Sequence, residues 1–272
     1  MKRAFSFYVF SNMHVALSAT CLVLLTLWHY GDIRLSLALF VFCSTVLSYN
    51  FIQRFEMDRS YPVLSQWTRS SSRPLLVLNL IMVAGLVYAA LQLRLTDLIF
   101  VFPFFLLTLF YVYPGSRKIK GLRSLPGLKL FVIGLVWAGV TVLFPLWVSD
   151  RPFSTGDWVI FLQRFLLILA ITLPFDIRDL QLDKEELATL PQKLGIRNSK
   201  WVAIFALAAF AVLFYAFREF TWAERLAGLV ISVLAGVLVI RSGVVQNKYY
   251  SAFWVEAVPI VWYLLTLGFS FI

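Results

Sequence analysis

Charged residues are scarce in this sequence. Only 14% of its 272 residues are Asp, Glu, Lys or Arg, whereas 61% are hydrophobic and 17% are aromatic. A soluble domain carries about 25% charged residues, so this composition excludes an ordinary soluble protein. The chain also has no low-complexity tract and no segment that resembles a soluble domain. We therefore predict an integral membrane protein.

A cysteine framework and a cleavable signal peptide are also missing. The only cysteines, Cys21 and Cys43, fall inside apolar stretches, where they behave as small apolar residues rather than as a disulfide or metal pair. The apolar stretch after Lys2 and Arg3 is long and has no small-residue cleavage site before Trp28. The first helix is therefore expected to stay uncleaved.

The sequence does contain a series of apolar stretches of roughly 17 to 22 residues, long enough for a helix to cross about 30 Å of hydrocarbon. About nine spans are predicted, at residues 12–29, 34–54, 74–93, 97–114, 129–148, 158–176, 201–217, 224–241 and 253–271. We expect an all-α membrane protein in which residues 1–272 form a single polytopic domain. Similarly placed acidic runs suggest duplicated four-helix units at 12–114 and 129–241, followed by a final helix at 253–271.

The basic residues are distributed unevenly, and this distribution predicts the topology. With a cytoplasmic N-terminus, 18 of the 24 Lys and Arg lie on the cytoplasmic side, and six lie on or near the other side. This is the positive-inside pattern, so the net charge of +10 indicates topology and contact with lipid head groups rather than nucleic-acid binding. We expect a multi-pass protein, of a bacterial inner membrane, with its functional loops in the cytoplasm.

The most informative polar segment is PFDIRDLQLDKEE, which follows a predicted span. Asp176, Asp179 and Asp183 are spaced i, i+3 and i+7, so on a helix their carboxylates share one face. Like charges repel in low-dielectric surroundings, and Mg²⁺ is the natural ion to hold them, with water and substrate phosphates completing its shell. The alternative is a solvated acidic helix end in which Arg178 and Lys184 pair with these carboxylates.

The longer stretch DIRDLQLDKEELATLPQKLG resembles the second aspartate-rich segment of the UbiA-type intramembrane prenyltransferases. In that family, D-x-x-D-x-x-x-D is followed by a Thr-Leu-Pro or similar stretch and a Leu-Gly, as it is here. The stretch YPGSRKIKGLRSLPGLKLFVIGLVW is similar to the family's Tyr-Pro basic loop before span five. Tyr113 and Arg117 occupy its Tyr-x-x-x-Lys positions, with Lys118 beside them. Together with nine predicted helices, the resemblance covers nearly the whole chain.

The family's first motif, N-D-x-x-D-x-x-x-D at the end of span two, aligns with YNFIQRFEMDRSYP. Asn50 and Asp58 match this motif, whereas Phe51 and Arg54 replace two aspartates. Three interpretations of Arg54 stay open. It can pair with Asp58, it can bind the diphosphate directly through its guanidinium group, or it can mark a site that has lost catalysis.

The resemblance implies a bundle of about nine helices that encloses a central cavity open toward the cytoplasmic side. It also implies Mg²⁺-dependent transfer of an isoprenoid chain from a prenyl diphosphate to a lipophilic, often aromatic, acceptor among membrane lipids. The implied catalytic and Mg²⁺-binding residues are Asp58, Asp176, Asp179 and Asp183. The implied diphosphate-binding residues are Asn50, Arg54, Tyr113, Arg117 and Lys118.

A second function class stays open beside the enzyme. A non-catalytic UbiA-like protein that binds an isoprenoid, a quinone-like lipid or a partner protein is favoured by the loss of two first-motif aspartates and disfavoured by the intact second motif. A secondary transporter is less favoured, because the carboxylates cluster at the membrane surface instead of the midplane. The sequence does not specify the acceptor, the chain length or the oligomeric state.

Four further polar residues lie inside predicted spans, where they are costly in lipid and are expected to face protein or water. They are His14, Asn79, Arg164 and Glu256. Arg164 is placed close enough to the outer surface for its side chain to snorkel, and Glu256 close enough to the inner surface to pair with Lys248 or another base.

Overall fold

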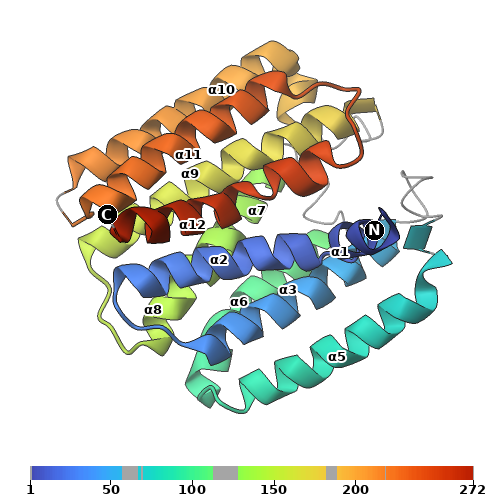
Figure 1. Cartoon of the computed structure of the whole chain (residues 1–272), viewed down its shortest axis with the longest axis vertical. Coiled ribbons are helices and arrows are strands. Elements are labelled where there is room, and N and C mark those ends of the chain that lie inside the picture. The colour runs from blue at the N-terminus through green and yellow to red at the C-terminus, as the bar shows by residue number, and fades with distance from the viewer. Residues whose placement is uncertain are drawn as a thin grey trace.

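The computed structural model describes residues 2–56, 67–68, 70–112, 128–181, 189–217 and 219–271, and the regular secondary structure in these ranges is helical (Figure 1). In chain order the elements are α1 (Lys2–Phe10), α2 (Met13–His29), α3 (Leu35–Glu56), α5 (Ser72–Ala90), α6 (Leu95–Val112), α7 (Leu128–Ala138), the π-helix η2 (Gly139–Leu143), α8 (Phe144–Val148), α9 (Thr155–Arg178), the 3-10 turn η3 (Asp179–Gln181), α10 (Leu190–Ala216), α11 (Trp222–Arg241), the π-helix η5 (Tyr250–Val255) and α12 (Val258–Ser270).

The predicted spans correspond closely to these helices, since each of the nine predicted ranges is helical over most of its length. Within the described residues, seven helical runs are long and apolar enough to cross a membrane, and α1 with α2 makes an eighth if this pair, bent by 55°, is one span. α6 contains a shorter apolar run, Leu95–Phe110. The chain is thus a multi-pass, all-helical membrane protein, and the proposed duplication of four-helix units stays a prediction.

The break between α1 and α2 was not predicted. It falls at Ser11 and Asn12, and Asn12 adopts a left-handed conformation with φ 64°. Asparagine tolerates this conformation better than most residues, because its short polar side chain can bond locally. Here the side chain of Asn12 instead reaches α3, where its amide nitrogen donates to Asn50 at 2.9 Å and to Gln53 at 2.7 Å.

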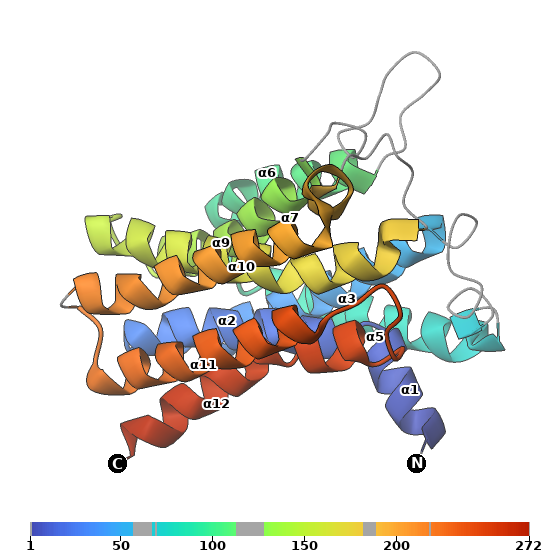
Figure 2. The same ribbon diagram turned by 90° about the horizontal axis from the view of Figure 1, so that it is seen from above.

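The helices lie side by side along one direction, and consecutive spans alternate in direction (Figure 2). The α1–α2 break, the start of α7 and the ends of α3 and α9 lie toward the same end of the bundle as the N-terminus. We call this the motif end. The other end carries the connections that follow α2, α5 and α8, and the C-terminus.

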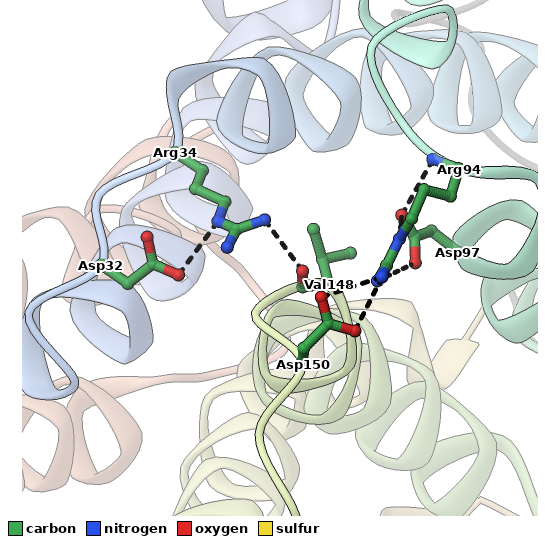
Figure 3. Close-up of polar contacts among 6 residues, drawn as sticks. All are labelled: Asp32, Arg34, Arg94, Asp97, Val148 and Asp150. Carbon is green, nitrogen blue, oxygen red and sulfur yellow. Dashed lines mark hydrogen bonds and ion pairs between the residues drawn. The ribbon is translucent and has the colours of Figure 1, made fainter.

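A cluster of ion pairs joins the three connections at that other end (Figure 3). Arg94 pairs with Asp97 at 2.8 Å and with Asp150 at 2.7 Å, which links the start of α6 to the connection after α8. Arg34 pairs with Asp32 at 2.9 Å and donates to the carbonyl of Val148, also at 2.9 Å. The carboxylates of Asp97 and Asp150 both raise the pKa of Arg94, so its guanidinium group stays charged.

The fifth span is continuous but irregular, because π-helix η2 interrupts it between α7 and α8. Pro145 has no N–H to bond the carbonyl of Thr141, four residues earlier, and a carbonyl left without a donor is costly inside a membrane. The hydroxyl of Thr26, from α2, donates to this carbonyl at 2.7 Å. A side chain of a neighbouring helix thus stabilises the irregular segment.

π-helix η5 is supported by the same helix. His14 lies with its Nε2 2.9 Å from the carbonyl oxygen of Phe253, so this nitrogen carries the proton and donates, while Nδ1 bonds the hydroxyl of Tyr8 at 2.8 Å. The hydroxyl of Ser18 donates to the carbonyl of Glu256. Of the two predicted surroundings of His14, protein or water, the structure shows protein, because both ring nitrogens bond protein atoms.

Arg164 corrects one prediction, because it does not snorkel. Its side chain is fully buried between α2, α9 and α12, with only 2% of its surface exposed. The Nη2 atom donates to the carbonyl of Leu22 and to the hydroxyl of Thr26, and the guanidinium carbon lies 4.7 Å from the ring centre of Trp262. The aromatic face and the α2 oxygens take the place that water was expected to fill.

Candidate functional site

A cavity of about 1620 Å³ lies inside the bundle and reaches the motif end. Most of its wall is apolar and comes from α2, α3, α6, α7, η2 and α9. The charged and carboxamide side chains that line it are Asn12, Asn50, Gln53, Arg54, Asn79, Lys129, Arg178, Asp179, Gln181, Lys248 and Glu256. Since most of these residues lie at the motif end of their helices, the cavity has a polar mouth and an apolar interior.

One side of the mouth, formed by the start of α7 and the end of α9, holds the second acidic motif. Asp176 is completely buried, and its Oδ1 lies 2.6 Å from the ammonium nitrogen of Lys129, whose side chain is 12% exposed. Lys129 lines the cavity, whereas Asp176 lies behind it, outside the set of lining residues. The carboxylate thus holds Lys129 in place at the cavity wall.

Asp179 is arranged differently from the prediction. α9 ends at Arg178, and Asp179 begins the 3-10 turn η3, so the α-helical face expected through Asp176, Asp179 and Asp183 is already interrupted at its second member. Asp179 lines the cavity and forms an ion pair with the neighbouring Arg178, Oδ1 to Nε at 2.7 Å. Asp179 therefore lines the cavity, whereas Asp176 is buried behind Lys129.

The opposite side of the mouth is a neutral network of side-chain amides, formed by the α1–α2 break, the end of α3 and the start of α5. Asn50 accepts from Asn12 at 2.9 Å and donates to Asn79 at 2.7 Å. Gln53 accepts from Asn12 at 2.7 Å and donates to Thr68 at 2.9 Å. Asn50 therefore has a firm structural role at the position of the first motif.

Arg54 lies one helical turn beyond Asn50, on the cavity wall with an exposed side chain. Among the described residues it forms no ion pair. Phe51, the other departure from the family's motif, also lines the cavity and is 45% exposed. The position of Arg54 is compatible with an anion ligand, and its predicted alternative partner, Asp58, lies outside the described residues.

Four more predicted site residues lie outside the described residues. They are Tyr113, Arg117, Lys118 and Asp183. Their roles stay predictions from the resemblance.

The described residues do not by themselves make a magnesium site. Within them, no group of three or more Asp, Glu, His or Cys side chains could hold a metal ion. The two described members of the predicted set, Asp176 and Asp179, each form an ion pair with a cation at 2.6–2.7 Å. A metal site at this mouth would need Asp183 or Asp58, or the opening of one of these pairs.

Several residues at the mouth were not predicted. Lys129 and Gln53 were not singled out, and Lys248 was expected only to pair with Glu256. In the described residues that pair is not formed, and the ammonium group of Lys248 lies 5.8 Å from the ring centre of Phe10 instead. The signal for Lys129 was present but weak: it is a lone cation at the start of a span.

Comparison with solved structures identifies the fold. An apo structure of a UbiA homolog from Aeropyrum pernix K1 matches 97% of this chain and 98% of its own, with a TM-score of 0.64 and 17% sequence identity. The chain has the UbiA fold. The resemblance predicted from the motifs is confirmed in the fold, over 97% of the chain. The sequence matches no protein-family model and no curated protein.

The UbiA fold explains why the altered first motif and the intact second motif lie at one site. α3 and α9 each end at the motif end, so residues more than a hundred positions apart, such as Asn50 and Asp179, line the same cavity. This juxtaposition agrees with the predicted topology, in which the functional loops lie on one side of the membrane. Which side of the membrane the mouth faces stays a prediction.

Proposed function

We propose that this protein transfers an isoprenoid chain from a prenyl diphosphate to a lipophilic, aromatic acceptor in the membrane. The observation that carries the proposal is the shape and charge of the cavity. Its mouth is lined by four cations, Arg54, Lys129, Arg178 and Lys248, and by two carboxylates, Asp179 and Glu256. An amphiphile with a multiply charged anionic head and a long apolar tail fits such a site.

The residues at the mouth supply what a departing diphosphate needs. In the transfer, the bond between C1 of the chain and the diphosphate oxygen breaks, and the electron pair leaves with the diphosphate. The acceptor forms a new bond to C1 and loses a proton. Among the described residues of the cavity lining, the carboxylates that could accept this proton are Asp179 and Glu256. Cations fixed around the leaving group favour the developing negative charge, and the apolar wall keeps water from the allylic cation.

Among these cations, Lys129 has an ion-pair partner with no exposed surface. Its partner Asp176 is buried behind it, so the ammonium group is positioned without presenting that carboxylate to the cavity. Arg54 carries a permanent charge that suits phosphate oxygens, at the place where the family's motif has an aspartate. We propose that it takes over part of the work that a metal-bridged aspartate does in the family.

Magnesium dependence belongs to the same proposal. When bound, Mg²⁺ neutralises charge on the diphosphate, and in this chain Asp179 with Asp183 and Asp58 would hold it. Because Asp179 faces the cavity, Asp179→Asn should reduce the gain in donor affinity that Mg²⁺ gives by roughly 10- to 100-fold, as changes around metal sites do. Isothermal titration with and without Mg²⁺ measures this gain, and Asp32→Asn, at the other end of the bundle, is the matched control.

A second candidate is favoured by the neutral amide network. A UbiA-like protein that binds an isoprenoid lipid without catalysis needs no carboxylates at the position of the first motif. The amide side chains of Asn50, Gln53 and Asn79 supply none there. Membranes containing the protein, a labelled prenyl diphosphate, Mg²⁺ and a panel of aromatic acceptors separate the two. A prenylated product that Asp179→Asn abolishes supports the enzyme. Tight donor binding without product from any acceptor supports the binding protein.

A further inference from the structure

One of the aromatic rings on the cavity wall is packed directly against a glycine. Phe104, in the middle of α6, lines the cavity and packs against Gly139, the first residue of π-helix η2. α6 and α7 lie next to each other in Figure 2. Gly139 is buried and is not itself a lining residue, so the ring covers it from the cavity side.

The contact leaves no room for a side chain at Gly139. A Cβ atom built there would lie 2.0 Å from Cε1, 2.4 Å from Cζ and 2.8 Å from Cδ1 of Phe104. Real Cβ contacts essentially never come this close, so any larger residue would displace the ring. Only glycine allows the ring to be seated fully against the helix.

The ring lies well inside the cavity. Gly139 is ten residues after Lys129 in the sequence, which corresponds to roughly 15 Å along a helix from the cationic mouth. The cavity continues beyond the ring toward the other end of the bundle, where Leu98 and Val101 of α6 and Phe40 of α3 line it. A tail that starts at the mouth must therefore pass Phe104 to reach the inner part.

The backbone that carries Gly139 is itself held in position. Thr141, two residues further, lines the cavity, and its carbonyl accepts from Thr26 of α2. Arg164 in turn donates to the hydroxyl of Thr26. The wall behind Phe104 is thus fixed by polar contacts, so the cavity side is the direction in which the ring can move.

We infer that Phe104, seated on Gly139, determines the length of isoprenoid chain that the cavity accepts. The inference rests on the proposed function for the identity of the tail, but it concerns a wall that lies away from the diphosphate. Gly139→Ala moves the ring into the cavity and selects against long tails. Phe104→Ala removes the ring and favours them.

The experiment measures the binding of a series of prenyl diphosphates to the protein in lipid nanodiscs. Geranyl, farnesyl and geranylgeranyl diphosphate are compared for wild type, Gly139→Ala, Phe104→Ala and the double variant. Gly139→Ala should lower the geranylgeranyl-to-geranyl affinity ratio on the order of tenfold, with geranyl affinity unchanged, because small steric changes in apolar pockets discriminate by about this factor. Phe104→Ala should raise the ratio, and the double variant should follow Phe104→Ala.

Gly236→Ala is the matched control, because a Cβ there would meet only ordinary contacts at 3.5 Å and beyond, outside the cavity lining. Its ratio should equal that of wild type. Equal weakening of all donors by Gly139→Ala, or an unchanged ratio in both Phe104→Ala and Gly139→Ala, overturns the inference. If Gly139→Ala fails to fold, Phe104→Ala decides alone.

Prenyl alcohols of the same lengths separate this inference from the proposed function. If wild type binds no diphosphate but the alcohols show the same dependence on Gly139 and Phe104, the diphosphate function fails and the length-determining wall stands. If diphosphates bind and the ratios do not respond, the wall fails and the function stands. Absence of binding by both series overturns both.

Discussion

On the α7–α9 side of the cavity mouth, carboxylates lie against cations, whereas on the α1–α3–α5 side, amides bond to amides. Asp176 with Lys129 and Asp179 with Arg178 represent the first arrangement. Asn50 between Asn12 and Asn79 represents the second. Both satisfy polar groups near the membrane, but only the first depends on charge, so the two sides should respond differently to substitution.

The largest difference should come from breaking the buried pair. Lys129→Met removes the cation that lies 2.6 Å from a carboxylate with no exposed surface, and removing one partner of a buried pair typically costs about 3–5 kcal/mol of stability. The double variant Lys129→Met/Asp176→Asn should recover most of this free energy, because no charge is then left buried. Thermal unfolding in a defined detergent measures both, and Lys193→Met, on an exposed side chain, is the control. Equal destabilisation by the single and double variants would contradict the pairing.

Charging the amide side should cost less. Asn50→Asp keeps the acceptor for Asn12 but replaces the amide that donates to Asn79 with an oxygen, so two acceptors face each other. Leaving such a group without its partner costs about 1–3 kcal/mol. Asn198→Asp, on an exposed residue outside the cavity, should change stability little. A fully stable Asn50→Asp variant would show that this side of the mouth tolerates a carboxylate.

Arg54 tests whether the amide side takes part in anion binding. Arg54→Asp restores the family's residue, and removal of a charged ligand should weaken diphosphate binding at low Mg²⁺ roughly tenfold, in line with about 1.5 kcal/mol for a hydrogen bond to a charged group. Stability should change by less than about 0.5 kcal/mol, because the side chain is exposed. Arg54→Gln separates loss of charge from its reversal. Unchanged donor affinity in both variants would support the ion pair with Asp58 instead.

The smallest effect is expected at the opposite end of the bundle. Asp150→Asn weakens an ion pair whose side chains are 50% and 68% exposed, and such exposed pairs contribute about 0–1 kcal/mol. Donor affinity should be unchanged, since Asp150 is not a lining residue. Stability and titration measurements on the same preparation provide the baseline for the other variants. A clear loss of binding here would mean that the two ends are coupled.

Much of the architecture could be predicted from the sequence, because hydrophobic run length determines where helices cross a membrane. The positions of all nine ranges and the convergence of the two motif regions at one end follow from run length and from counting connections. The chemical partners did not follow. Nothing local indicates that Lys129 reaches Asp176, since the two lie on different helices and are 47 positions apart.

The amide network was missed for a related reason. It depends on Asn12, which is placed by a helix break at a Ser-Asn pair with neither glycine nor proline to signal it. The i, i+3, i+7 interpretation of the second motif assumes that α9 continues past Asp179, but the chain forms a 3-10 turn there, as helices commonly do at their ends, and Asp183 lies outside the described residues. Spacing alone assumes a regular helix and cannot detect this change.

The polar side chains of α2 have a consequence for the whole bundle. His14, Ser18 and Thr26 bond backbone carbonyls of two different irregular spans. Each bond specifies a single carbonyl, so a shift of either span by one residue would leave a hydroxyl or imidazole facing the wrong group. α2 thereby sets the axial register of the fifth and the last spans. The residues of these spans that line the cavity therefore stay at fixed distances from its mouth.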